Sequence, residues 1–158
     1  MRRAKKEITD KSQIIDILQE AHIGRLGTHS REGYPMIKPV NFVLIGERLY
    51  FHSAREGEKI EDIRRDNRVC FEVDVPIRYM EANGDPCRAF YQYRSVIIKG
   101  RAVMIEDGDE KRRMLGALMK KYQPAGGYGD FPEEKLALTA VVRIEITEMT
   151  GKEDLTER

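Results

Sequence analysis

Apolar and polar residues alternate along much of this chain with the two-residue period of half-buried β-strands. The alternation is cleanest over 68–74, where Val69, Phe71 and Val73 fall on one side, and that side is predicted to be buried. Other stretches rich in β-branched and aromatic residues bring the predicted strands to six. These stretches are 24–30, 36–45, 48–54, 94–106 and 136–152.

Three segments instead carry apolar residues at helical spacing and predict helices near 10–22, 55–66 and 107–122. Asp10 and Asp107 stand where an N-cap is expected, since a carboxylate can accept hydrogen bonds from the first backbone N–H groups of a helix. A glutamate follows Asp107 three residues later, in the capping-box pattern. The apolar face of the third helix is predicted to belong to the core.

Glycine and proline residues mark interruptions in the strands. Pro39 has no N–H to donate, so it predicts an edge or a bulge within 36–45. Gly100 predicts a bulge or a close backbone approach. Residues 75–93 break the alternation and contain the turn pair Asn83-Gly84. We expect a long loop there, which either covers a site or is a solvated excursion.

The predicted strands are mostly joined by hairpins, and helices do not alternate with them regularly, so a parallel doubly wound sheet is not favoured. Closing an antiparallel sheet removes its exposed edges. The pattern predicts a mainly β protein with peripheral helices, built on a closed or nearly closed antiparallel barrel. A chain of 158 residues suits one such domain over 1–158.

The charges nearly balance, since 28 Lys and Arg against 27 Asp and Glu leave a net charge of +1. Nucleic-acid binding through a general basic field is not expected, because that mode neutralises many phosphates. Two cysteines and three scattered histidines make a poor set of zinc ligands, so no metal site is predicted. The N-terminus lacks a signal-peptide core and no apolar run approaches the roughly 20 residues of a membrane span, so we expect a cytoplasmic protein without a membrane partner.

A candidate phosphate site lies where the predicted strand 48–54 runs into the second helix. The strand ends near His52 and Ser53, a polar turn with Gly57 follows, and the helix begins near Lys59. Backbone N–H groups at a helix start have no partner within the helix, and the helix dipole there favours negative charge. The serine hydroxyl and the lysine charge would complete the site. The alternative is a capping serine beside a solvated lysine.

Three polar residues could serve a cofactor or a substrate. His52, with an ordinary pKa of about 6.5, suits proton transfer at neutral pH, although a histidine at a strand end is often a packed, hydrogen-bonded residue. Asn41 and Ser95 interrupt apolar runs and could hydrogen-bond a flat heterocycle, or could simply be an edge-strand asparagine and a strand-start serine. No catalytic triad can be assembled, so hydrolase chemistry is not supported.

The order of five segments is more specific than any one of them. They are GRLGT, YPMIKPVNFV, RLYFHSAREGEKIEDIRRDNRVCFEVD, YRSVIIKGRAVMIED and LTAVVRIEITEMTGK. Together, from about residue 7 to 153, they resemble the pyridoxamine 5′-phosphate oxidase-like FMN-binding split-barrel superfamily, and within it the nitroimidazole-resistance (Nim) branch. The resemblance implies a six-stranded antiparallel split β-barrel that forms a homodimer with FMN at the subunit interface.

By position, the resemblance implies a role at the flavin for six residues. They are Val40 and Asn41 along the isoalloxazine ring, His52 and Ser53 on the next strand, Lys59 at the phosphate, and Ser95 on a later strand that approaches the flavin. In the Nim branch the residue matching His52 is proposed to take part in the reaction. The resemblance thus makes His52 the candidate catalytic residue.

The sequence also departs from the oxidases. Glu58 precedes Lys59 where they carry a second basic residue, which weakens charge compensation for a phosphate. The sequence has no Trp and ends soon after MTGK, so we do not expect the C-terminal segment that the oxidases use for their substrate. Oxidation of pyridoxamine phosphate is therefore not expected.

The leading hypothesis is an FMN-dependent oxidoreductase that reduces a small flat electrophile such as a nitroaromatic or nitroimidazole, with electrons from a reduced nicotinamide or another donor. His52 would donate a proton or position that substrate. One alternative is a module that binds a flavin, deazaflavin or haem without turnover. Another is a dimeric barrel that has no cofactor.

Overall fold

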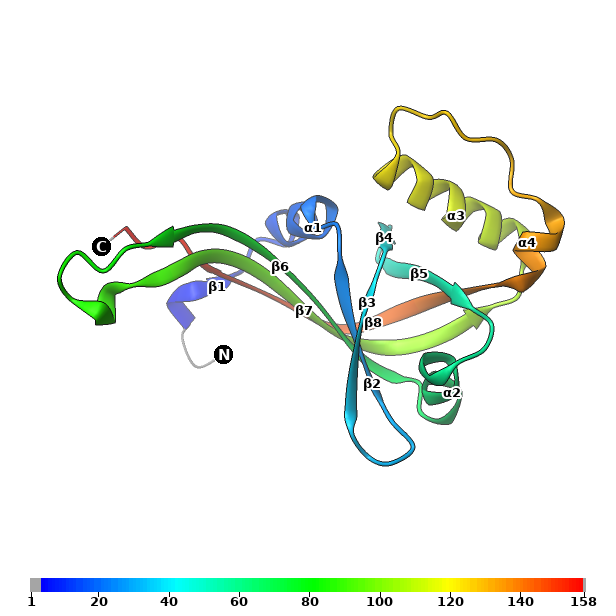
Figure 1. Ribbon diagram of the computed structural model, residues 1–158, viewed down its shortest axis with the longest axis horizontal. Helices are drawn as coiled ribbons and strands as arrows, with labels where there is room; N and C mark the ends of the chain where they lie inside the picture. Colours follow the sequence, from blue (N-terminus) through cyan, green and yellow to red (C-terminus); the bar gives the residue numbers. More distant parts are fainter. Residues whose placement is uncertain (1–3, 158) are drawn as a thin grey trace.

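The computed structural model describes residues 4–157, whose strands form one antiparallel sheet (Figure 1). The strands are β1 (Glu7–Ile8), β2 (Gly24–His29), β3 (Pro35–Val40), β4 (Phe42–Ile45), β5 (Arg48–Ala54), β6 (Arg68–Met80), β7 (Phe90–Ile105) and β8 (Thr139–Asp154). Neighbouring strands follow the order β3-β2-β6-β7-β8-β5-β4, and β1 pairs with β8 beside this path.

The sheet closes on itself because β3 and β4 are consecutive in the chain and separated only by Asn41. β3 pairs with β2 at one end of the strand order, and β4 pairs with β5 at the other. The predicted antiparallel split barrel is confirmed, with eight strands in place of six. The predicted strand 36–45 is interrupted at Asn41 and counts as two, while β1 is too short to show a pattern. Pro39 lies on β3 at the end of the strand order, as predicted.

The helices lie around the barrel, and the predicted caps are present. Asp10 accepts a hydrogen bond from the Ser12 N–H at 2.8 Å, and Asp107 accepts one from the Glu110 N–H at 2.7 Å. The helices are α1 (Lys11–Glu20), α2 (Glu58–Arg65), α3 (Gly108–Tyr122) and α4 (Glu133–Leu138), with 3₁₀ turns η1 (Ala4–Lys6) and η2 (Pro86–Arg88). α4 corrects the prediction that a strand begins at 136. Acidic residues in its first turn favour a helix start.

Two apolar layers stabilise this arrangement. The first fills the barrel and includes Phe42, Phe51 and Phe71, all fully buried. The second includes Tyr50 and Met114 and lies between strands β4, β5 and β8 and the helices α3 and α4. Successive residues of β5 therefore serve different layers, with Phe51 in the barrel and Tyr50 beneath α3, as the two-residue period of a strand requires.

The long loop predicted over 75–93 is mostly wrong, because β6 and β7 continue through it to Met80 and Phe90. Tyr79 lies opposite Tyr91, with ring centroids 5.4 Å apart. A register shift follows Pro76, whose missing N–H disturbs the ladder. We call residues 76–93 the arm. It extends beyond the barrel, far from α2 and α3 (Figure 1).

β7 and β8 approach each other closely at Gly100. It lies at the predicted bulge, where the register shifts after Lys99, and a Cβ there would be 2.6 Å from the Glu145 carbonyl oxygen and 2.5 Å from Ile144 Cγ2. Because a backbone oxygen in a sheet cannot move freely, we expect Gly100→Ala to lower the free energy of unfolding by roughly 1–3 kcal/mol in urea denaturation.

Gly116→Ala is the matched control, since a Cβ at that position of α3 meets nothing within 4 Å. It should raise the free energy of unfolding by up to about 1 kcal/mol, as alanine favours a helix. Equal stabilities for the two variants would contradict the close approach at Gly100.

Candidate functional site

The start of α2 is shaped to receive an anion. A short turn joins Ala54, the last residue of β5, to Gly57, the N-cap residue, whose φ of +109° is readily available only to glycine. No side chain caps this helix, and the Ile60 N–H donates to the Gly57 carbonyl at 2.9 Å, so the N–H groups of Glu58 and Lys59 are the ones that face a ligand. The positive end of the helix dipole points at the same place.

Two lysines add positive charge beside this helix start. Lys59 lies in the first turn of α2, half-buried, with its Nζ 5.6 Å from the centroid of the Phe51 ring. Lys38 comes from β3, and its Nζ is buried without a well-directed hydrogen bond, 2.7 Å from Glu58 Oε2. Burial and then the charge of Lys38 lower the pKa of Lys59. Two cations therefore lie beside the helix start, and two carboxylates lie near Lys38: Glu58, 2.7 Å from its Nζ, and Asp62, whose pKa the charge of Lys38 helps to lower.

Lys38 was not among the predicted site residues. It pairs in register with Leu26, a residue of the barrel core, so it occupies an inward position of β3. A lysine in a stretch as apolar as 36–45 was the signal in the sequence. The inward position of Lys38, and so its contact with α2, depends on the pairing of β3 with β2.

His52 and Ser53 are neighbours on β5 and therefore face opposite sides. His52 lies at the rim of a pocket of about 240 Å³ between β5 and the helices α3 and α4. The other lining residues are mostly apolar: Leu115, Leu118, Met119, Phe131, Lys135, Leu136 and Thr139. Partial burial and then the positive charge of Lys59 lower the pKa of the His52 imidazole. The lowered pKa favours the neutral imidazole, which can donate or accept a hydrogen bond.

The remaining predicted contacts fall in two places. Val40 is buried at the end of β3, two residues beyond Lys38 on the same side of the strand, and Asn41 is exposed next to it. Ser95 lies elsewhere. On β8, Ser53 pairs with Ala140 whereas Ser95 pairs with Lys152, twelve residues further along. At about 3.3 Å per residue, this separation is roughly 40 Å of strand.

A buried carboxylate fixes α2 against the barrel. Asp62 accepts hydrogen bonds from Thr28 Oγ1 of β2 at 2.9 Å and from Arg65 at 2.7 Å. Burial acts to raise the pKa of Asp62, but these two donors hold it below its usual value. The hydrogen bond from Thr28 to the Asp62 carboxylate ties α2 to β2, and this contact holds the start of α2 beside Lys38.

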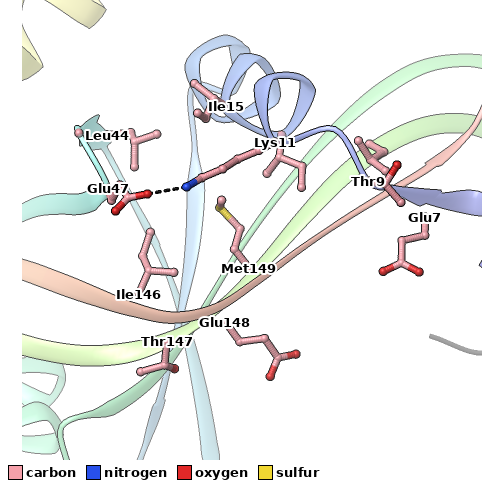
Figure 2. A pocket seen from close by; sticks show the side chains of 13 residues that line it. Glu7, Thr9, Lys11, Ile15, Leu44, Glu47, Ile146, Thr147, Glu148 and Met149 are labelled. Carbon is pink, nitrogen blue, oxygen red and sulfur yellow. Dashed lines mark hydrogen bonds and ion pairs between the residues drawn. The ribbon is translucent and has the colours of Figure 1, made fainter.

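Another pocket, of about 570 Å³, lies between α1, the β4–β5 turn and β8 (Figure 2). Apolar side chains such as Ile146 and Met149 line it, and an ion pair of 2.5 Å between Lys11 and Glu47 crosses its opening. None of the predicted flavin contacts lines this pocket. It is therefore separate from the candidate site.

The barrel, the lysine pair and the histidine pocket together define a split-barrel protein with a candidate anion site at a helix start. The chain belongs to the pyridoxamine 5′-phosphate oxidase family, whose model matches residues 10–153. This confirms the resemblance drawn from the sequence. No curated protein sequence is detectably similar to the chain.

Solved structures share the fold. A candidate 5-nitroimidazole antibiotic resistance protein from Bacteroides thetaiotaomicron is 29% identical, with a TM-score of 0.82 over 92% of this chain and 85% of that one. A flavocytochrome from Azotobacter vinelandii is 21% identical, with a TM-score of 0.87 over 99% and 72%. An FAD- and heme-binding protein from Mycobacterium smegmatis is 19% identical, with a TM-score of 0.86 over 96% and 74%.

Two further predictions concern metal binding and membrane crossing. Across residues 4–157, no group of three or more His, Cys, Asp or Glu side chains is placed to hold a metal ion. Within the same residues, each helix is too short or too polar to cross a bilayer.

The His52 pKa tests the electrostatics of the site. NMR titration of the imidazole in ligand-free protein should give a pKa below 6.5, because partial burial and Lys59 both oppose protonation. Lys59→Met should raise this pKa by removing one cause while leaving the other. A wild-type pKa of 6.5 or above would contradict the described surroundings of His52.

Proposed function

We propose that this protein is an FMN-dependent oxidoreductase that acts as a homodimer and reduces small flat electrophiles such as nitroaromatic compounds. The observation that carries the proposal is the lysine pair at the uncapped start of α2. Lys38 Nζ is buried with the exposed Glu58 carboxylate 2.7 Å away, and a phosphate oxygen would give it a further charge-assisted partner. Family membership and the flavin implied by the name of the flavocytochrome support a flavin, and the candidate phosphate site is our reason for choosing FMN.

The residues present fit the phosphate of FMN. Lys38, Lys59 and the N–H groups at the start of α2 would hold it, with the Ser53 hydroxyl next to them. Glu58 now neutralises Lys38 at 2.7 Å and would have to move aside. The sequence predicted that Glu58 weakens phosphate binding. In the proposed complex it would do so because its carboxylate competes with the phosphate for the Lys38 ammonium group.

Bound FMN would supply the electron-transfer chemistry, and the chain would supply orientation and exclusion of water. Val40 and Asn41 lie beyond Lys38 on the path from β3 to β4, where they would frame the ring. Neutral His52 would position the substrate through a hydrogen bond rather than through charge.

The pocket at His52 favours an uncharged aromatic substrate. Its lining is apolar apart from Lys135, Thr139 and His52 itself, so a flat ring can be desolvated there at little cost. The nitroimidazole named for the protein from Bacteroides thetaiotaomicron fits this description.

A second copy of the chain would complete the site. Ser95 is separated from Ser53 by roughly 40 Å of strand, so one chain alone cannot use both. Ser95 lies on an outer face of the sheet that also carries Ile37 and Ile97, exposed by 69% and 45%. Exposed apolar side chains on one face are typical of a surface that a partner covers.

Replacing the lysines tests the phosphate site. We expect Lys38→Met and Lys59→Met each to weaken FMN binding roughly 10- to 100-fold in a fluorescence titration, since a charge-assisted hydrogen bond contributes about 1.5–3 kcal/mol. Glu58→Gln should tighten binding by removing the competing carboxylate. Lys120→Met, an exposed lysine of α3, is the matched control and should bind like the wild type. Wild-type affinity in both Lys38→Met and Lys59→Met would contradict the assignment.

The reaction is tested with flavin-loaded protein, a reductant and a panel of nitroimidazoles. His52→Gln should lower turnover by roughly tenfold or more while FMN remains bound, because glutamine keeps a donor but not the ring geometry. No consumption by the wild type would contradict the oxidoreductase. A Soret band in the purified protein would favour haem and make His52 a candidate ligand.

A further inference from the structure

We propose that the arm of each chain crosses to the other subunit and covers the flavin site there, with the Tyr79–Tyr91 pair as its contact surface. This inference rests on the proposed function, which places FMN between two copies of the chain. It assigns to residues 76–93 a role in enclosing the partner's site.

The arm cannot reach the site of its own chain. Ile105 of β7 and His52 of β5 pair with the same residue of β8, Val141, so that end of β7 lies at the level of the site. The arm is at the opposite end of β7, where Phe90 pairs with Met80. Fifteen residues separate Phe90 from Ile105, which is roughly 50 Å of strand. Figure 1 shows the two ends pointing in opposite directions.

Beyond its own two strands, the arm makes few contacts with its own chain, chiefly from Gln92 Nε2 to the Thr156 carbonyl at 3.2 Å and from Arg78 to Glu157 at 3.6 Å. β8 pairs with β7 only as far as Tyr93, so the rest of the arm is a two-stranded ribbon within the described part of the chain. Two-stranded ribbons are marginally stable in water. This ribbon nevertheless exposes Ile77, Tyr79 and Tyr91 by 42%, 55% and 57%. Large apolar side chains on such a ribbon indicate that another surface covers them.

The register specifies which surface. Tyr91 and Ser95 are four residues apart on β7 and therefore share a face, about 13 Å from each other. Tyr79 lies opposite Tyr91 on the same face. If Ser95 approaches the partner's flavin, the tyrosine pair lies against the partner's surface just beyond the flavin ring. That surface comprises the partner's β5, α2 and α3, the elements around the candidate site.

A photocrosslink from the end of the arm tests this arrangement. Cys87 is exposed there, and Cys70→Ser leaves it as the single reactive thiol. A benzophenone maleimide on Cys87 is irradiated in dimers exchanged with unmodified ¹⁵N-labelled chains, and the adducts are mapped by mass spectrometry. We expect adducts to ¹⁵N-labelled peptides from β5, α2 or α3. Adducts confined to the modified chain, or to partner peptides outside these elements, would overturn the inference.

A second measurement does not depend on the crosslinker. Tyr79→Lys with Tyr91→Lys should weaken dimerisation at least tenfold in sedimentation equilibrium, because buried aromatic side chains dominate interface energies. Tyr128→Lys changes a tyrosine exposed by 41% outside the arm and should leave dimerisation unchanged. A monomeric wild type, or equal dimerisation of both variants, would overturn the inference.

FMN uptake by the same samples separates the two proposals. Adducts on the partner without FMN uptake would contradict the proposed function and support the crossing of the arm. FMN uptake with adducts only inside one chain would contradict the crossing and leave the proposed function intact.

Discussion

The repulsion between Lys38 and Lys59 is the constraint on which the account of this molecule depends. Lys38 Nζ is buried and Lys59 is half-buried, and burial together with the charge of Lys38 lowers the pKa of Lys59. β3 and α2 supply them from different parts of the chain, and Asp62 fixes α2 so that they cannot move apart freely. Such an arrangement lowers stability unless an anion occupies it. Glu58 is a partial substitute that the chain supplies itself.

The alternation of side chains along β5 assigns neighbouring residues to opposite sides of the strand near the candidate anion site. On β5, Phe51 packs in the barrel beneath Lys59, whereas Tyr50 packs under α3. The next two residues continue this alternation, so that Ser53 can serve the phosphate while His52 serves the apolar pocket. The phosphate site and the apolar pocket therefore lie on opposite sides of one strand and share no side chain. This geometry links the fold directly to the proposed chemistry.

Local signals made much of the fold predictable from the sequence. The caps at Asp10 and Asp107 and the alternation over 68–74 depend on residues a few positions apart, and all appear as predicted. Features that depend on distant pairing were missed. The inward position of Lys38 follows from its pairing with β2, and the arm follows from pairing between β6 and β7 across a turn-rich sequence.

The candidate site was predictable in part for the same reason. His52, Ser53 and Lys59 lie within eight residues of one another, so a short motif could indicate them. Ser95 was one of several open candidates from its place beside an apolar run, and the resemblance to a family gave it a position at the flavin. The sequence could not show that it lies far from the others within one chain. That separation emerges only when the register of β8 is known.

In the proposed complex, Lys38 and Lys59 hold the phosphate of FMN. The most direct measurement compares the affinities of ligand-free protein for FMN and for riboflavin, which carries the same ring without a phosphate. If two charge-assisted contacts are made, FMN should bind roughly 100-fold more tightly or better. Equal affinities would show that the phosphate contributes nothing and would contradict the role of Lys38 and Lys59.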